Sequence, residues 1–313
     1  MSGNMATNLM QINRDSYSRS YFLTELNSTD HNESALFLYY EMMNTSLKFL
    51  FFLFLLLTSP LMMANNLEEG NRLFDAGQYK EAITFLTKPD IRTDPGAMNL
   101  VAYMYNHGLG IQKNPEIAFE MYKKAANAGL PVAQFNLGLF YEKGKVVSPN
   151  QTEAIKWFRK AADQNYPTAE AKMGYLTVMG RGVKKDYSRA LKWYHQAAEH
   201  GEIGAYSHIG LFYDKGHGVK KDPNRAVQFY IMGAEKGDSE AQLFLADCYA
   251  KASGIPYDPD RALYWYKESA KNGNVTAMKV LSGIYKLGQL GVQKNPEKSR
   301  HWLEMAKLKE AQP

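Results

Sequence analysis

The feature that most constrains this chain is an alanine that recurs every 36 residues, six times and without a gap. A small residue stands five positions after each of these alanines, and a tyrosine stands eight positions after most of them. A fixed period of this length is typical of repeat proteins, in which each unit buries its apolar face against the next unit. The alanines are Ala97, Ala133, Ala169, Ala205, Ala241 and Ala277.

Each unit contains two apolar stretches with spacings near three and four, which predict two helices. A glycine-containing turn separates them, as in Met179 to Tyr187, where Gly180 and Gly182 can take a positive φ at low cost. An Asp or Asn then stands where the second helix needs an N-cap, often followed by proline at the first helical position. These N-cap candidates are Asn114, Asp186, Asp222, Asp258 and Asn295, and Gly129, Gly201, Gly237 and Gly273 fit the C-caps.

The segment from Leu67 to Pro89 is a shortened version of the same unit, because Ala82 lies 36 residues before Ala118. An atypical first unit of this kind is expected to act as a cap. The sequence therefore predicts an all-α protein, a right-handed α/α solenoid of about seven helix pairs. Trp193, in a column of aromatic residues and Met, is expected to wedge between neighbouring pairs.

The units from Ala169 to Gly201 and from Gly204 to Asp238 resemble Sel1-like repeats, which are related to the tetratricopeptide repeat. The resemblance covers residues 95 to about 308, and Leu67 to Pro89 resembles a tetratricopeptide repeat instead. It implies a scaffold for protein–protein interaction of a kind common in bacteria, whose exported members serve in host interaction, envelope assembly and signalling. Some members with paired cysteines in every repeat are linked to β-lactams. This chain has one cysteine, so that activity is not carried over.

The segment from Met43 to Asn66 has a short polar start, an apolar run from Phe49 to Leu57 and a small-residue site at Ala64, the pattern of a secretory signal peptide. We expect the following organisation: residues 1–42 disordered or an artefact of start-site choice, 43–64 a signal peptide, 65–94 a tetratricopeptide-like capping repeat, and 95–313 six Sel1-like repeats. A cytoplasmic tail on an uncleaved anchor at residues 49–63 is the competing interpretation. The expected location is periplasmic or secreted, or membrane-anchored under that alternative.

Motifs for catalysis are missing from the sequence. Ser-x-x-Lys does not occur after Ala64, and neither G-x-S-x-G nor H-E-x-x-H occurs at all. His195 and His200 are five residues apart, off a common helical face, and Cys248 falls in an apolar column, which predicts a buried thiol. We therefore expect no catalytic residues, no cofactor and no metal. The alternative from another class is an envelope hydrolase or a peptidoglycan- or glycan-binding factor on the same scaffold.

Lysines recur in equivalent turns, at Lys184, Lys185, Lys220 and Lys221. They are either solvated turn residues or a basic strip that attracts an acidic partner, an anionic glycan or a lipid headgroup. Nucleic acid is not expected as a partner, because no basic patch has interleaved stacking aromatics. The expected partner is a protein, the expected state is a monomer, and a membrane is a partner only if residues 49–63 form an anchor.

The binding face is predicted from the first helix of each unit. Positions two and six residues after the repeat alanine lie off its buried stripe, and their residues vary while the framework repeats. Such positions are where partner-specific chemistry can sit, although packing against the neighbouring helix pair is an equally good explanation of them. The predicted protein-binding groove comprises Asn99, Tyr103, Phe135, Leu139, Tyr175, Ser207, Leu211, Leu243 and Asp247.

Overall fold

A computed structural model describes residues 65–311. The chain divides into two compact units, Met1–Glu68 and Glu69–Pro313, and the second is described here by itself. The expected signal peptide at residues 43–64 and the segment 1–42 lie outside the described residues. Within residues 65–311, no helix combines the length and the apolar character that a membrane span requires.

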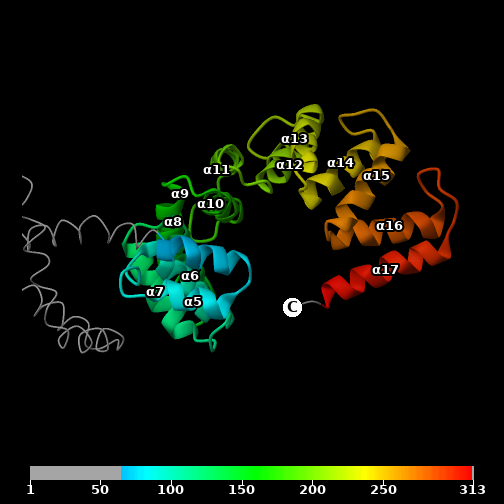
Figure 1. The fold of residues 1–313 in the computed structure, drawn as a ribbon. Helices are drawn as coiled ribbons and strands as arrows, with labels where there is room; N and C mark the ends of the chain where they lie inside the picture. The colour runs from blue at the N-terminus through cyan, green and yellow to red at the C-terminus, as the bar shows by residue number, and fades with distance from the viewer. Residues whose placement is uncertain (1–64, 312–313) are drawn as a thin grey trace, which may run out of the picture. The chain divides into compact units, whose positions relative to one another are not determined.

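The described residues are helical, and the helices come in antiparallel pairs (Figure 1). A helix at residues 65–75 precedes α5 (Tyr79–Leu86). Six further pairs follow: α6 (Pro95–His107) with α7 (Pro115–Asn127), α8 (Pro131–Lys143) with α9 (Gln151–Ala162), α10 (Pro167–Met179) with α11 (Tyr187–Glu199), α12 (Ala205–Lys215) with α13 (Pro223–Glu235), α14 (Ser239–Lys251) with α15 (Pro259–Lys271), and α16 (Val275–Leu287) with α17 (Pro296–Glu310). The prediction of an all-α solenoid of about seven helix pairs is confirmed.

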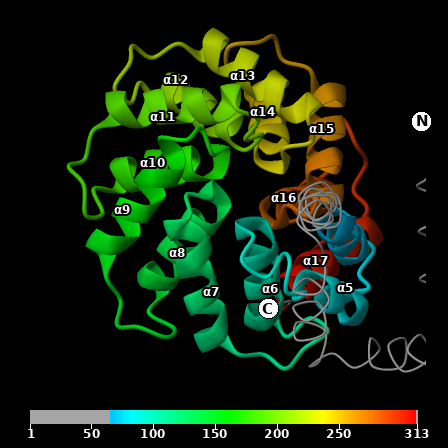
Figure 2. The same ribbon diagram turned by 60° about the vertical axis from the view of Figure 1, so that its left-hand side comes forward.

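Successive pairs follow one another along a curved path, and each helix packs chiefly on its neighbours in sequence (Figures 1 and 2). In Figure 2 the first helices α8 and α14 lie on the inner side of this curve, and their partners α9 and α15 lie on the outer side. A first helix therefore packs on helices before and after it and leaves a narrow strip on the inner side.

The helix ends follow the sequence closely. Every predicted Asp or Asn N-cap accepts a hydrogen bond from the backbone N–H three residues later, as Asp186 does from Arg189 at 2.9 Å. The first helices α6, α8, α10, α12 and α16 end at a glycine with positive φ, whereas α14 ends at Ala252 with φ 54°. The glycines assigned to the C-caps of the second helices lie one residue beyond them, at φ values such as 97° for Gly129. The αL residue after the C-cap is where glycine is favoured.

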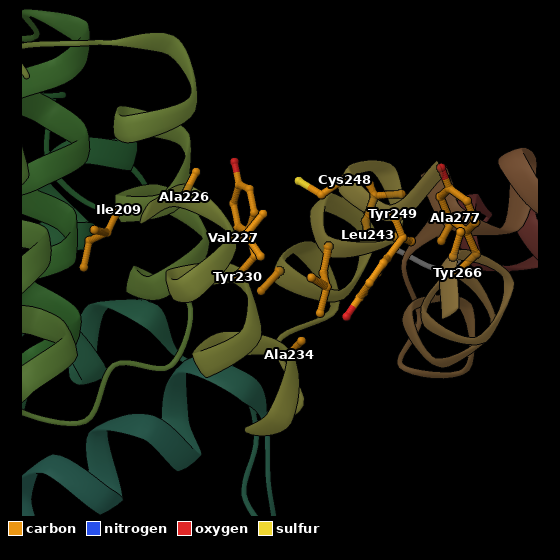
Figure 3. Close-up of a cluster of buried hydrophobic side chains, with 14 of the residues drawn as sticks. Ile209, Ala226, Val227, Tyr230, Ala234, Leu243, Cys248, Tyr249, Tyr266 and Ala277 are labelled. Atoms are coloured by element: carbon orange, nitrogen blue, oxygen red, sulfur yellow. The ribbon is translucent and has the colours of Figure 1, made fainter. Parts of the chain in front are cut away.

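The core is held by an aromatic column that the sequence analysis did not single out. Its members lie four residues after the second alanine of each unit, next to the predicted Trp and Met column: Tyr122, Phe158, Tyr194, Tyr230 and Tyr266, all at most 4% exposed. Trp193 is only partly buried, although it packs on the apolar cluster of α9 and α10. Figure 3 shows Tyr230 and Tyr266 among the buried side chains of the C-terminal part.

The glycine at the small-residue position of α8, α10 and α12 makes room for this column. A Cβ added at Gly138 would lie 2.6 Å from Cε1 of Phe158, too close for two carbon atoms. At Gly174 the corresponding distance to the Tyr194 ring is 3.1 Å. The small residues were predicted to bring helix backbones together. At these three glycines the more specific role is to accept an aromatic ring from the second helix of the same pair.

Candidate functional site

The nine predicted groove positions are exposed to different degrees. Tyr103 and Tyr175 have exposed fractions of 39% and 37%, large values for tyrosines in a packed repeat. Asn99 and Leu243 are 9% exposed, and Ser207 is 0% exposed. The remaining positions, Phe135, Leu139, Leu211 and Asp247, are partly buried. Accessible surface at these positions is therefore best developed on α6, α8 and α10.

The structure brings Tyr103 and Leu139 together at one pocket on α6 and α8. Its volume is about 290 Å³, and the buried ring of Tyr122 forms part of its wall. Tyr103 is fixed from two sides, by the edge of Phe74 at 5.9 Å and by the His107 ring at 4.2 Å between centroids. The lining residues are Tyr103, Asn106, His107, Tyr122, Asn136, Leu139, Phe140, Lys143 and Lys145.

The pocket is apolar at its base and basic at its rim. Partial burial lowers the pKa of His107, and the positive charges of Lys113, Lys145 and Lys143 lower it further. These three lysines have no ion pair within residues 65–311. Among the described residues, no carboxylate lines the pocket. The two lysines of the rim, Lys143 and Lys145, therefore carry positive charge that no ion pair within residues 65–311 balances.

The other N-terminal groove residues make contacts of their own. Phe135 packs on the rings of Phe158 and Tyr166 at 5.4 and 5.7 Å, so it belongs mainly to the interior. Asn99 accepts a hydrogen bond from Asn136 of the next repeat at 3.2 Å. Tyr175 has two cations over its ring, Lys172 at 5.6 Å and Arg181 at 5.8 Å.

The C-terminal groove residues are closed off by their own neighbours. Ser207 donates to the carbonyl of Gly204 at 2.8 Å, which ties it to the start of α12. Asp247 accepts a hydrogen bond from the hydroxyl of Tyr266 and pairs with Lys251. Leu243 lies in the apolar cluster, and Leu211 is partly buried beside that cluster's members on α12. These positions stabilise the stack and offer a partner little free surface.

The structure places the remaining candidates without gathering them into a catalytic group. Cys248 is 7% exposed, as predicted, and burial together with Asp214 and Asp247 raises the pKa of its thiol to about 12. Burial lowers the pKa of His195, because desolvation disfavours the charged imidazole. Within residues 65–311, no group of three or more His, Cys, Asp or Glu side chains is placed to hold a metal ion.

The turn lysines lie on outer loops. Lys185 stands over the Tyr187 ring at 4.9 Å, and Lys220 and Lys221 border a hollow of about 480 Å³ beside Arg225. The Arg225 guanidinium covers the Tyr213 ring at 4.4 Å. Each group of lysines therefore contacts its own turn, and their action as one strip stays a prediction.

The sequence did not reveal that the buried acid Glu170 pairs with His200. The Glu170 side chain is 0% exposed, and its carboxylate meets Nδ1 of His200 at 2.8 Å. Gln134 and Gln242 occupy the same repeat position, and Gln164 and Asn272 donate to their side-chain oxygens at 2.9 Å. The partner lies 30 residues later in each case, and this shared spacing is the signal that would have found the pairs. Each of these contacts joins the start of a first helix to the residues at or just after the end of the second helix in the same repeat.

Comparison with protein families gives the Sel1 repeat six times, at residues 95–130, 131–166, 167–202, 204–238, 239–274 and 276–309. A Sel1 repeat protein from Oxalobacter formigenes is 69% identical, with a TM-score of 0.75 over 79% of this chain and 99% of that one. A protective antigen of uropathogenic Escherichia coli strains is 30% identical, with a TM-score of 0.58 over 79% of this chain and 61% of that one.

More distant structures share the fold alone. An immunity protein from Pseudomonas aeruginosa is 18% identical, with a TM-score of 0.51 over 69% of this chain and 83% of that one. A comparison with curated protein sequences gave no significant match.

Proposed function

The chain belongs to the Sel1 repeat family, and from this premise we propose that it is an exported, non-enzymatic scaffold that binds a protein partner through the inner face of its first helices. Sel1 repeat proteins are generally protein-interaction scaffolds without enzyme activity. For this chain, the partner and the inner face as its binding surface belong to the proposal.

One observation carries the proposal. Two tyrosines at equivalent inner positions, Tyr103 and Tyr175, are more than one-third exposed in repeats whose other Phe, Tyr and Trp side chains are all buried or partly buried. Tyrosine is enriched among residues that dominate binding energy at protein interfaces. Neither tyrosine is required to fill the core, because Tyr122 and Tyr194 do so from the second helices.

The binding test compares the full chain with a variant that carries both Tyr103→Ala and Tyr175→Ala. A partner recovered by cross-linking from the bacterial envelope or the culture fluid is purified, and its affinity for each protein is measured by calorimetry. Each substitution is expected to weaken binding by more than about 1 kcal/mol with little change in the thermal midpoint. An unchanged affinity in the double variant would place the partner elsewhere.

Export is proposed from the sequence pattern at Met43 to Asn66. A mature N-terminus near Asn65 is expected, and the intact mass of protein recovered from the periplasm measures it. Recovery of a membrane-bound species that retains residues 49–57 would favour the anchor instead. A protective antigen among the relatives supports a role at the bacterial surface in host interaction.

A further inference from the structure

The pocket on α6 and α8 combines an apolar base with an uncompensated basic rim, and this combination points to the chemistry of a ligand. Tyr103 and Leu139 supply apolar surface, while Lys143 and Lys145 supply charge at the edge of the same 290 Å³ space. This volume is at the lower limit of pockets that hold small molecules. It matches one or two side chains of a protein segment better than a whole ligand.

The charge at this rim is particular to the N-terminal repeats. A lysine recurs at the tenth position after the repeat alanine in α8, α12 and α14. Lys215 pairs with Asp214 at 2.7 Å, and Lys251 pairs with Asp247. Lys143 has no such partner within residues 65–311, because Glu142 beside it pairs with Lys172 at 2.8 Å. The same framework position is thus neutralised in the fourth and fifth Sel1 repeats but not in the second.

The neighbouring charges add to this local field. Lys113, Lys143 and Lys145 all act on His107, which lies against the Tyr103 ring at 4.2 Å. A cluster of like charges repels itself, and a bound carboxylate relieves that repulsion. A segment with acidic residues beside an aromatic one would satisfy both parts of the pocket.

Resting on the proposed function, we propose that this pocket binds an acidic–aromatic segment of the protein partner. A ring of that segment enters between Tyr103 and Leu139, and an adjacent carboxylate lies against Lys143 and Lys145. Aromatic anchors in pockets and charge complementarity at the rim are the two features that give such contacts affinity and specificity.

The test uses the full chain and a fluorescein-labelled synthetic peptide in which one Trp is flanked on each side by two Glu residues. Fluorescence anisotropy at low salt is expected to show saturable binding. Peptides with Gln in place of Glu, or with Ala in place of Trp, are each expected to bind about tenfold more weakly or worse. Equal binding of all three peptides would overturn the proposal.

Matched charge variants locate the site. The double variant Lys143→Glu, Lys145→Glu is expected to lose about tenfold or more in affinity, and Leu139→Lys is expected to lose a similar factor by filling the base. The control Lys220→Glu, Lys221→Glu changes the net charge by the same amount at exposed turn residues and is expected to leave affinity within about twofold. Circular dichroism checks that each variant remains helical.

The outcomes separate this inference from the proposed function. Equal losses in the pocket variant and the control would show that net charge, and not the pocket, attracts the peptide. A preference for an alginate oligosaccharide over the peptide would overturn the proposal in favour of an acidic glycan. If the captured protein partner binds through Tyr103 and Tyr175 but ignores Lys143, Lys145 and Leu139, the scaffold function stands and the pocket assignment is wrong.

Discussion

The first and fifth Sel1 repeats share the same packed framework, but their inner faces differ. The first has an open pocket, and the fifth is closed by its own side chains. In both, a tyrosine of the second helix is buried behind the first helix, Tyr122 at 2% and Tyr266 at 4% exposure. In the fifth repeat Asp247 binds the Tyr266 hydroxyl and pairs with Lys251. In the first repeat the equivalent position is Tyr103, which stands beside an open pocket. The same repeat position therefore carries a side chain that closes the inner face in the fifth repeat and one that stands beside a pocket in the first.

The largest effect tests the shared framework. Tyr122→Ala and Tyr266→Ala each remove a buried ring, and each is expected to lower the free energy of unfolding by about 3–5 kcal/mol, measured by urea denaturation. In a linear stack, hydrogen exchange should accelerate mainly in the mutated repeat and its neighbours. Uniform acceleration from residue 69 to 311 would contradict the solenoid account.

Most of this framework could be predicted from the sequence. The repeat period is visible in the alanines. N-cap residues such as Asp186 and the turn glycines could also be predicted, because local backbone geometry favours particular residue types at those positions. The buried aromatic column was missed, because Trp193 and Tyr194 are adjacent and a rotation of about 100° per residue decides which one faces the core. Only the packing of α11 on its neighbours fixes that angle, and it buries Tyr194.

The site was harder to predict than the fold. The outward positions include the two exposed tyrosines, Tyr103 and Tyr175, but also the fully buried Ser207. Whether a lysine is paired depends on distances between side chains, as Lys251 and Lys143 show at the same repeat position. A sequence period assigns positions to a face, whereas tertiary packing decides which of those positions remain accessible.

A smaller difference in unfolding free energy should distinguish the closed inner face of the fifth repeat from the open inner face of the first. Tyr266→Phe removes a hydrogen bond to the Asp247 carboxylate, and we expect it to cost about 1–2 kcal/mol in unfolding free energy, less than the upper range for charged partners because Asp247 also has Lys251. Tyr122→Phe, which affects no carboxylate, is expected to cost less than about 0.5 kcal/mol. Equal costs in urea denaturation would show that the hydroxyl of Tyr266 does not close the fifth repeat.

The smallest effect concerns two histidines in opposite fields. Burial lowers the pKa of both His107 and His208, but lysines lower the first further, whereas Glu240, Asp238 and Glu202 oppose the shift of the second. Added salt screens these charges, so the pKa of His107 should rise by a few tenths of a unit and that of His208 should fall. Titrations followed by NMR at low and high salt measure both, and a rise at both sites would contradict the charge difference.

The lowered pKa values of His107 and His208 also determine the direction in which folding stability changes with pH. Because the folded state holds each imidazole neutral, the unfolded state binds more protons once the pH falls below about 6.5. Stability should therefore decrease as the pH is lowered from that value toward the folded pKa. His208→Asn should flatten this loss, and an unchanged slope would show that His208, stacked on Tyr194 at 4.6 Å, does not contribute to it.

The most direct test of the account is a hydrogen-exchange footprint of the full chain with and without the bound protein partner. The account predicts slower exchange in α6 and α8, which carry Tyr103, Leu139 and Lys143, and little change in α14. Protection concentrated in α14, where Asp247 accepts a hydrogen bond from Tyr266 of α15, would contradict it.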